Sequence, residues 1–144
     1  MLRMILNQAF NKARGLYKAE NHDAIYIFGD LNFRVNLKNK EARQAIIERN
    51  INFLKQHDEL TIIRNSEAQF DSGQIFELDD DLRGELVKNE IFNKFQEGEI
   101  DFFPTYKFDK GTNNYDSSSK KRVPSWTDRI LFAGKQSVVS LLEY

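Results

Sequence analysis

The sequence of 144 residues contains no cysteine, only two histidines and two prolines, and no long hydrophobic run. Without cysteine, the chain has no thiolate nucleophile, no disulfide framework and no cysteine-ligated zinc ion. Its apolar stretches, such as residues 25–28 and 138–139, are far shorter than the roughly 20 residues of a membrane-spanning helix. The apolar start, residues 1–6, is short, contains Arg3 and lacks a cleavage site for a secretory signal. These absences predict a cytoplasmic protein.

What is present supports a folded domain whose charge is unevenly distributed. Twelve Phe and one Trp supply large apolar side chains, and the length suits one domain or part of one. Residues 71–101 hold ten acidic and three basic side chains, and residues 107–135 hold seven basic and three acidic ones. The acidic block is typical of a solvated surface. The basic block clusters at residues 120–122 and favours a phosphate-bearing partner, which the charge alone does not identify.

The spacing of apolar residues predicts a domain that mixes helices with strands. Asn39 is the expected N-cap of the second helix, and a further helical turn is expected from residue 58. Residues 66–73 and 109–121 are expected to be loops. The predicted helices are residues 1–17, 40–50, 51–56 and 82–95, and the predicted strands are residues 24–28, 100–103, 129–132 and 137–142. Such a mixture indicates an α/β or α+β layered fold.

A first candidate functional segment follows the strand at residues 24–28. Asp30 and Asn32 stand two positions apart, just past the strand end, and their side chains can project toward one opening. Asp30 could act as a general base on water or as a metal ligand, and Asn32 could donate to a phosphoryl oxygen. The same residues also suit a turn that simply ends a strand. Taken alone, the segment favours the turn.

A second candidate segment contains the clustered cations. Lys107, Lys120 and Arg122 could converge on one phosphate, with Arg as a planar fork and the lysines as point charges. Tyr106 could add a hydroxyl group. A solvated basic loop explains the same residues without any ligand.

The end of this segment carries two further candidates. Trp126, the only tryptophan, is expected to pack under the loop and fix the direction in which the chain leaves it. Asp128 opens the strand at residues 129–132 and could orient another catalytic group. The alternatives are a core tryptophan and a surface ion pair between Asp128 and Arg129.

The two segments, in this order, resemble the signatures of the inositol polyphosphate 5-phosphatases. Residues 29–34, Gly-Asp-Leu-Asn-Phe-Arg, are similar to the Gly-Asp-x-Asn-Tyr-Arg motif of that family. Residues 103–108 and 120–131 are similar to its Pro-Thr-Tyr-Lys and Lys-x-Arg-x-Pro-x-Trp-Cys-Asp-Arg-Ile-Leu motifs. Phe33 replaces the usual Tyr, Thr127 stands where Cys is common, and residues 71–89 resemble an acidic insertion.

The resemblance implies a partial DNase I-like fold, a four-layer β-sandwich flanked by helices, and a Mg²⁺-dependent phosphatase. Asp30 would activate the attacking water, Asn32 would hold the scissile phosphate and Asp128 would orient a catalytic histidine. The side chains implied to bind the neighbouring 4-phosphate are Tyr106, Lys107, Lys120 and Arg122. The partner would be a phosphoinositide headgroup or a soluble inositol polyphosphate, with peripheral membrane contact and no nucleic acid.

The resemblance also predicts that residues 1–144 form only part of such a catalytic domain. The family's magnesium-binding Glu precedes the first motif, and its Ser-Asp-His motif follows the second. Neither is found here, since the only histidines are His22 and His57, and His57 is expected to cap a helix or lie on the surface. No complete metal site is therefore expected, and the isolated chain is predicted to be nearly inactive. The alternatives are a non-catalytic phosphoinositide-binding fragment and a nuclease, which the near-neutral charge disfavours.

Overall fold

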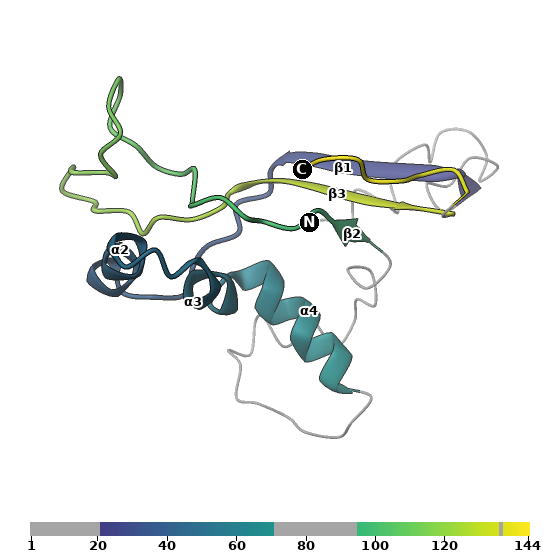
Figure 1. The fold of residues 1–144 in the computed structure, drawn as a ribbon, viewed down its shortest axis with the longest axis horizontal. Helices are drawn as coiled ribbons and strands as arrows, with labels where there is room; N and C mark the ends of the chain where they lie inside the picture. The colour runs from purple at the N-terminus through teal and green to yellow at the C-terminus, as the bar shows by residue number, and fades with distance from the viewer. Residues whose placement is uncertain (1–20, 71–94, 136) are drawn as a thin grey trace. The chain divides into compact units, whose positions relative to one another are not determined.

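A computed structural model describes residues 21–70, 95–135 and 137–144 (Figure 1). The chain divides into two compact units. The first consists of Met1–Ile27, Gln74–Glu99 and Ile130–Tyr144, and the second of Phe28–Gly73 and Ile100–Arg129. The predicted helix at residues 1–17, residues 82–94 of the predicted helix at 82–95, and the acidic insertion lie outside the described residues, and Phe95 is not helical. All the candidate catalytic and phosphate-binding residues fall within the second unit.

Three strands form one sheet in the order β1-β3-β2 (Figure 1). They are β1 (Ala24–Asp30), β2 (Gln96–Glu97) and β3 (Asp128–Gly134). Strand β2 runs antiparallel to β3, with Gln96 opposite Phe132. The predicted strands at residues 24–28 and 129–132 are confirmed, although β1 extends through Asp30 instead of stopping before it.

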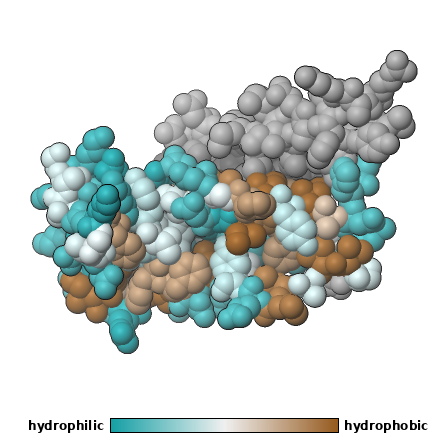
Figure 2. Space-filling model, turned by 90° about the horizontal axis from the view of Figure 1, so that it is seen from above, coloured by the Kyte–Doolittle hydropathy of each residue, from teal (hydrophilic) through white to brown (hydrophobic). Residues whose placement is uncertain are grey.

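Strand β1 was expected to be buried, and the structure shows that it is only half covered. Tyr26 is 56% exposed and Phe28 is 74% exposed, whereas Ile25 and Ile27, which alternate with them, are partly buried. Alternate side chains of a strand point to opposite faces, so a continuous apolar run does not by itself mean that both faces are covered. Apolar areas lie beside polar ones on the face of the molecule in Figure 2.

Two predicted strands are wrong. Residues 100–103 are not extended into a ladder, because the carbonyl of Phe102 accepts a hydrogen bond from the Trp126 indole instead. Residues 137–142 form a turn and irregular chain, in which the N–H groups of Val138 and Val139 both donate to the carbonyl of Lys135. The preference of β-branched residues for strands depends on neighbouring strands that supply packing and pairing.

Three helices follow β1 in the second unit. They are α2 (Asn39–Ile47), α3 (Ile51–Gln56) and α4 (Glu59–Phe70). The predicted helix at residues 51–56 is confirmed, and the side chain of Asn50 caps it by accepting the N–H of Phe53. Helix α4 begins where a turn was expected, but it continues through residues 66–70, which were predicted to be a loop. This stretch contains good helix formers and neither glycine nor proline, which explains why the helix does not stop there.

The predicted cap and end of α2 need correction. The N-cap is Lys38, whose N–H donates to Glu41 at 3.1 Å, and Asn39 is the first helical residue. The amide of Asn39 is used elsewhere, because it donates to the carbonyls of Lys121 and Arg122 at 2.8 and 2.9 Å. Arg49 lies beyond the helix with a positive φ of 56°. Asn39 thus joins α2 to the basic segment, residues 107–122, which holds the clustered cations.

The core of the second unit contains a buried ion pair. Nη1 of Arg129 lies 3.0 Å from both carboxylate oxygens of Asp58, and each side chain is only 1% exposed. Asp58 also accepts the N–H and the hydroxyl group of Thr61 in the first turn of α4. The alternative of a surface pair between Asp128 and Arg129 is therefore wrong, because Arg129 is buried and pairs with Asp58.

Candidate functional site

The loop after β1 is fixed to the segment that precedes β3. The N–H groups of Leu31 and Asn32 both donate to the carbonyl of Thr127, at 2.9 and 3.2 Å. The Asp30 carboxylate accepts the N–H of Asn32 at 3.0 Å, and Asn32 has a positive φ of 60°. Asn tolerates this left-handed conformation better than most residues. The turn that the sequence favoured is real, and it holds the exposed Asp30 and Asn32 beside the start of β3.

Asp128 stands at the start of β3, immediately after this attachment point. Its carboxylate accepts the hydroxyl group of Thr127 at 3.1 Å, and Thr127 is 1% exposed. The side chain of Asp128 itself is exposed. The buried Thr127 therefore orients the exposed carboxylate of Asp128. Thr127 stands where the family that the motifs resemble commonly has Cys.

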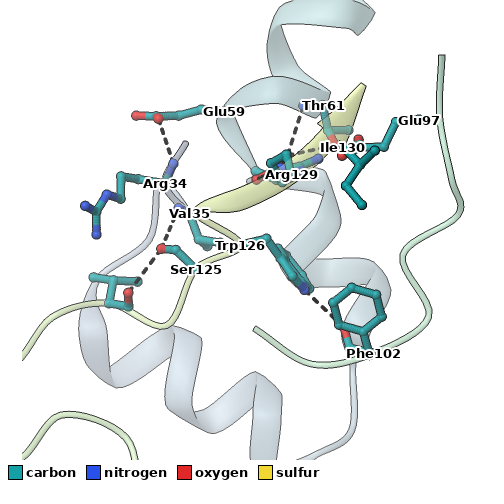
Figure 3. A network of polar contacts seen from close by, with 12 residues as sticks. Arg34, Val35, Glu59, Thr61, Glu97, Phe102, Ser125, Trp126, Arg129 and Ile130 are labelled. Atoms are coloured by element: carbon teal, nitrogen blue, oxygen red, sulfur yellow. Dashed lines mark hydrogen bonds and ion pairs between the residues drawn. The ribbon is translucent and has the colours of Figure 1, made fainter. Parts of the chain in front are cut away.

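Tyr106 is paired through its backbone with Ser125, which precedes Thr127 by two residues. The N–H of Tyr106 donates to the carbonyl of Ser125 at 3.0 Å, and the reverse bond is 2.8 Å long. The Ser125 hydroxyl accepts the N–H of Val35 at 3.1 Å (Figure 3). Ser125 thus joins the loop after β1, the segment around Tyr106 and the segment that leads into β3.

Arg34 bridges the two candidate segments through its side chain. Its guanidinium donates to the carboxamide oxygen of Asn32, and its central carbon lies 4.6 Å from the centre of the Tyr106 ring. The sequence comparison included Arg34 in a motif but assigned it no role. The signal was present, because an arginine two positions after an asparagine can reach it once the chain turns.

The three predicted phosphate-binding cations lie in different surroundings. Lys107 and Lys120 are exposed, and Arg122 is partly buried. Nη1 of Arg122 lies 3.2 Å from the carboxylate of Asp116, whose side chain is 2% exposed. Arg122 therefore carries an acidic partner inside the basic segment, which sequence reasoning did not predict.

Asp116 is a buried residue that forms hydrogen bonds to several residues of the basic segment. Its carboxylate accepts the N–H groups of Arg122 and Ser118, at 3.0 and 3.2 Å. Its own N–H donates to the carbonyl of Lys107 at 2.8 Å, and its carbonyl accepts the guanidinium of Arg43 on α2 at 2.6 Å. One buried acid thus connects the backbones of two predicted phosphate-binding residues. An acidic residue followed by three serines within a basic block was the available clue.

The chain between Lys107 and Asp116 closes on itself as a hairpin. The rings of Phe108 and Tyr115 stack with their centres 4.5 Å apart. The Tyr115 hydroxyl donates to the carbonyl of Pro104 at 2.7 Å, and burial raises the pKa of this hydroxyl against the opposing charge of Arg43. The predicted loop at residues 109–121 is confirmed, and it has internal order.

Trp126 is a core residue, as the structural interpretation expected. It is 1% exposed, and its indole N–H donates to the carbonyl of Phe102 at 3.1 Å. The packed indole anchors the segment that runs from Ser125 into β3.

His57 does not take part in this arrangement. It is the C-cap residue of α3, and Nδ1 lies 2.8 Å from the carbonyl of Phe53. The predicted capping role is confirmed.

An open groove of about 640 Å³ lies on another part of the second unit, along α2 and the start of α3. Its lining residues are Lys40, Glu41, Gln44, Ala45, Glu48, Asn50 and Phe53. None of the predicted site residues lines it.

Comparison with known proteins identifies the family. The chain matches the endonuclease/exonuclease/phosphatase family 2 over residues 2–79 and 72–144. The chain belongs to this family. Family 2 membership agrees with the resemblance inferred from the two motifs.

Relatives in this family are inositol polyphosphate 5-phosphatases. The phosphatidylinositol 4,5-bisphosphate 5-phosphatase INP51 of Saccharomyces cerevisiae is 38% identical over 92% of this chain. The inositol-1,4,5-trisphosphate 5-phosphatase 1 of Schizosaccharomyces pombe is 34% identical over 88% of it. The chain spans only 11% and 9% of the lengths of these two family 2 relatives.

Solved structures confirm the fold class. The inositol polyphosphate 5-phosphatase domain of SPsynaptojanin, in complex with inositol (1,4)-bisphosphate and calcium ion, has a TM-score of 0.59 and 36% identity. The match covers 85% of this chain and 30% of that one. The predicted DNase I-like architecture is thus confirmed as a partial sheet with helices. The ferrous NO complex of a Cimex nitrophorin variant also matches, with a TM-score of 0.57, 25% identity and coverage of 93% and 35%. Shared fold alone therefore does not define the reaction of a family 2 chain.

The described residues of this family 2 chain do not form a complete metal site. Asp30 and Asp128 supply carboxylates at the ends of two strands, but within residues 21–70, 95–135 and 137–144 no three His, Cys, Asp or Glu side chains cluster. Catalytic divalent cations commonly need several oxygen ligands besides water. Among the same residues, no helix is long and apolar enough to cross a membrane.

The acid stability of the family 2 chain should depend on Asp116. The backbone N–H of Arg122, helped by Ser118, holds the pKa of the Asp116 carboxyl well below its usual range. Because an unfolded Asp titrates near about pH 3.9, this stabilisation is present above that pH and is lost as the pH falls below it. We expect the melting temperature to fall less between pH 7 and pH 3 for Asp116→Asn than for the unaltered chain, as followed by circular dichroism. Equal falls would contradict this role.

Proposed function

We propose that this chain contributes the phosphate-binding part of an inositol polyphosphate 5-phosphatase catalytic domain. The names of its relatives support this proposal, and so does the ligand of the solved domain. The observation that carries it is the attachment of both motifs to one short segment. Leu31 and Asn32 bond to Thr127, and Tyr106 pairs with Ser125 two residues earlier.

Each side chain of the first motif then has a chemical role. Asp30, exposed and next to Asn32, accepts a proton from the attacking water. The Asn32 amide donates to an oxygen of the scissile phosphate, without adding negative charge. Asp128 orients the imidazole that protonates or binds the phosphate. His57 cannot supply this imidazole while it caps α3.

The second motif binds the adjacent phosphate of the inositol ring. Tyr106 donates a hydroxyl group, Lys107 and Lys120 supply ammonium charges, and Arg122 offers the donors that Asp116 leaves open. The partner is a phosphoinositide headgroup or a soluble inositol polyphosphate, reached from the cytoplasm with peripheral membrane contact. Mg²⁺ is the cation that the motifs imply, but the described residues supply too few ligands for it. The roles of Asp30 and Asn32 need only this chain, whereas Asp128 would orient an imidazole from outside the two motifs.

A non-catalytic inositol-phosphate binder is the second candidate. The absence of a three-ligand metal cluster in the described residues favours it for this chain taken alone. The basic segment, in contrast, is organised around Asp116. Binding with little turnover is therefore the expected behaviour of the 144 residues.

Titration calorimetry with inositol 1,4-bisphosphate tests the proposal. Lys120→Glu should weaken binding at least about tenfold, because a hydrogen bond from a charged group contributes about 1.5–3 kcal/mol. Lys110→Glu is the matched control, since Lys110 is an exposed lysine at the hairpin tip of the same segment. Equal losses for the two variants would show only a general charge effect and contradict the site.

The reaction itself is tested by phosphate release from phosphatidylinositol 4,5-bisphosphate with Mg²⁺. Asp30→Asn removes the base but keeps an oxygen that can accept the N–H of Asn32, so it separates chemistry from loop geometry. Any release by the unaltered chain should be abolished in this variant, and binding should persist. Release that survives Asp30→Asn would contradict the role of Asp30, and binding without release would favour the second candidate.

A further inference from the structure

Arg34 occupies the junction between the proposed catalytic amide and the proposed phosphate-binding tyrosine. Its guanidinium contacts Asn32 on one side and lies over the ring of Tyr106 on the other. We propose that Arg34 is a positioning residue that fixes which end of the Asn32 carboxamide faces the substrate phosphate. The proposal deepens the proposed function and rests on it for the identity of the ligand.

The direction of the Asn32 amide follows from the chemistry of arginine. A guanidinium has five N–H donors and no acceptor, so the atom of Asn32 that faces it must be the carboxamide oxygen. The NH₂ group then points away from Arg34 and remains available as a donor. A phosphoryl oxygen accepts hydrogen bonds, so this orientation suits phosphate, whereas the opposite one would present an oxygen to an anion.

The backbone of Arg34 is fixed independently of its side chain. Its N–H donates to the carboxylate of Glu59 at 2.7 Å, and its carbonyl accepts the N–H of Glu59 at 2.9 Å. The next residue, Val35, is 3% exposed and bonds to Ser125 (Figure 3). Glu59, in the first turn of α4, therefore fixes the backbone of Arg34. The position of the Arg34 guanidinium does not depend on Asn32 alone, so the guanidinium can orient the Asn32 amide.

Tyr106 holds the other side of the guanidinium. A cation over an aromatic ring within about 6 Å is attracted to the π face, and the distance here is 4.6 Å. Tyr106 is itself paired to the backbone of Ser125. The amide for one phosphate and the ring beside the adjacent phosphate are thus joined through one side chain. Loss of the ring should release Arg34, whereas loss of only the tyrosine hydroxyl should not.

The first test uses the ligand-free chain and observes the side-chain NH₂ signals of Asn32 by nuclear magnetic resonance. Arg34→Met keeps an apolar stem but removes every donor, so the Asn32 amide should become mobile. Arg49→Met is the matched control, because Arg49 is exposed and lies beyond α2. If Arg34→Met does not fold, Tyr106→Leu and Tyr106→Phe replace it, and only the former should mobilise the amide. An unchanged Asn32 signal in Arg34→Met, or in Tyr106→Leu where that replaces it, overturns the proposal.

The second test is a double-mutant cycle on the affinity for inositol 1,4,5-trisphosphate, which carries the 5-phosphate that the Asn32 amide is proposed to contact. Arg34→Met should weaken binding about tenfold, the loss expected when the Asn32 amide no longer donates its hydrogen bond to a charged phosphate. Asn32→Gly suits the positive φ and removes the amide, so adding Arg34→Met to it should cause no further loss. Additive losses would mean that Arg34 binds phosphate directly and would overturn the positioning role. If the unaltered chain does not bind this ligand, the proposed function fails, and the ligand-free test still decides the role of Arg34.

Discussion

Replacing Arg129 with methionine should lower the free energy of unfolding by about 3–5 kcal/mol, because it leaves the Asp58 carboxylate buried without its partner. Both side chains of this pair are 1% exposed, and both oxygens of Asp58 contact Nη1 of Arg129. Urea denaturation, followed by the fluorescence of Trp126, measures the change.

The double variant Arg129→Met with Asp58→Asn separates the pair from its surroundings. Asn keeps an oxygen for the N–H of Thr61 but leaves no uncompensated charge. The double variant should therefore be more stable than Arg129→Met alone. A loss below about 1 kcal/mol for Arg129→Met would be typical of an exposed ion pair and would contradict the buried one.

Replacing Trp126 with alanine should lower the free energy of unfolding by a similar amount, about 3–5 kcal/mol. The indole is 1% exposed and donates to Phe102, so the variant creates a cavity and leaves a carbonyl without its donor. Trp126→Phe keeps most of the volume and should cost less, about 1–2 kcal/mol for the lost hydrogen bond. Circular dichroism follows unfolding, since the fluorophore is removed.

The control for Trp126 is Leu142→Ala. Leu142 is also a large apolar residue, but it is 95% exposed, so its removal should change stability by less than about 0.5 kcal/mol. Equal effects of Trp126→Ala and Leu142→Ala would show that Trp126 is not part of the core. A loss of binding that exceeds the loss of folded chain would indicate that Trp126 also shapes the basic segment.

Local patterns predicted the elements that depend on local interactions. The helix at residues 51–56 was predicted correctly, because apolar spacing acts within a few residues. Its cap, Asn50, was instead expected to be the last residue of the preceding helix. The strands at residues 24–28 and 129–132 were predicted from short apolar runs between turn residues. The strand predicted at residues 137–142 was wrong, since pairing with another strand is not encoded in the run itself.

The candidate site shows the same division between local and distant interactions. Asp30, Asn32 and Asp128 could be proposed from motif order. In the structure, backbone hydrogen bonds from Leu31 and Asn32 to Thr127 join the two chain segments that carry them. The pairing of Asp58 with Arg129 joins residues 71 positions apart, and a charged residue in sequence looks the same whether it is buried or exposed. The role of Asp116 was missed for the same reason.

The hairpin after Lys107 also offers a practical site for engineering. Its base is closed where Asp116 bonds to the backbone of Lys107, and its tip is closed separately where the N–H of Asp109 donates to the carbonyl of Asn114 at 2.8 Å. Residues 110–113 therefore lie beyond both closures. A fluorescent reporter grafted there would travel with the phosphate-binding segment without altering the spacing of its cations.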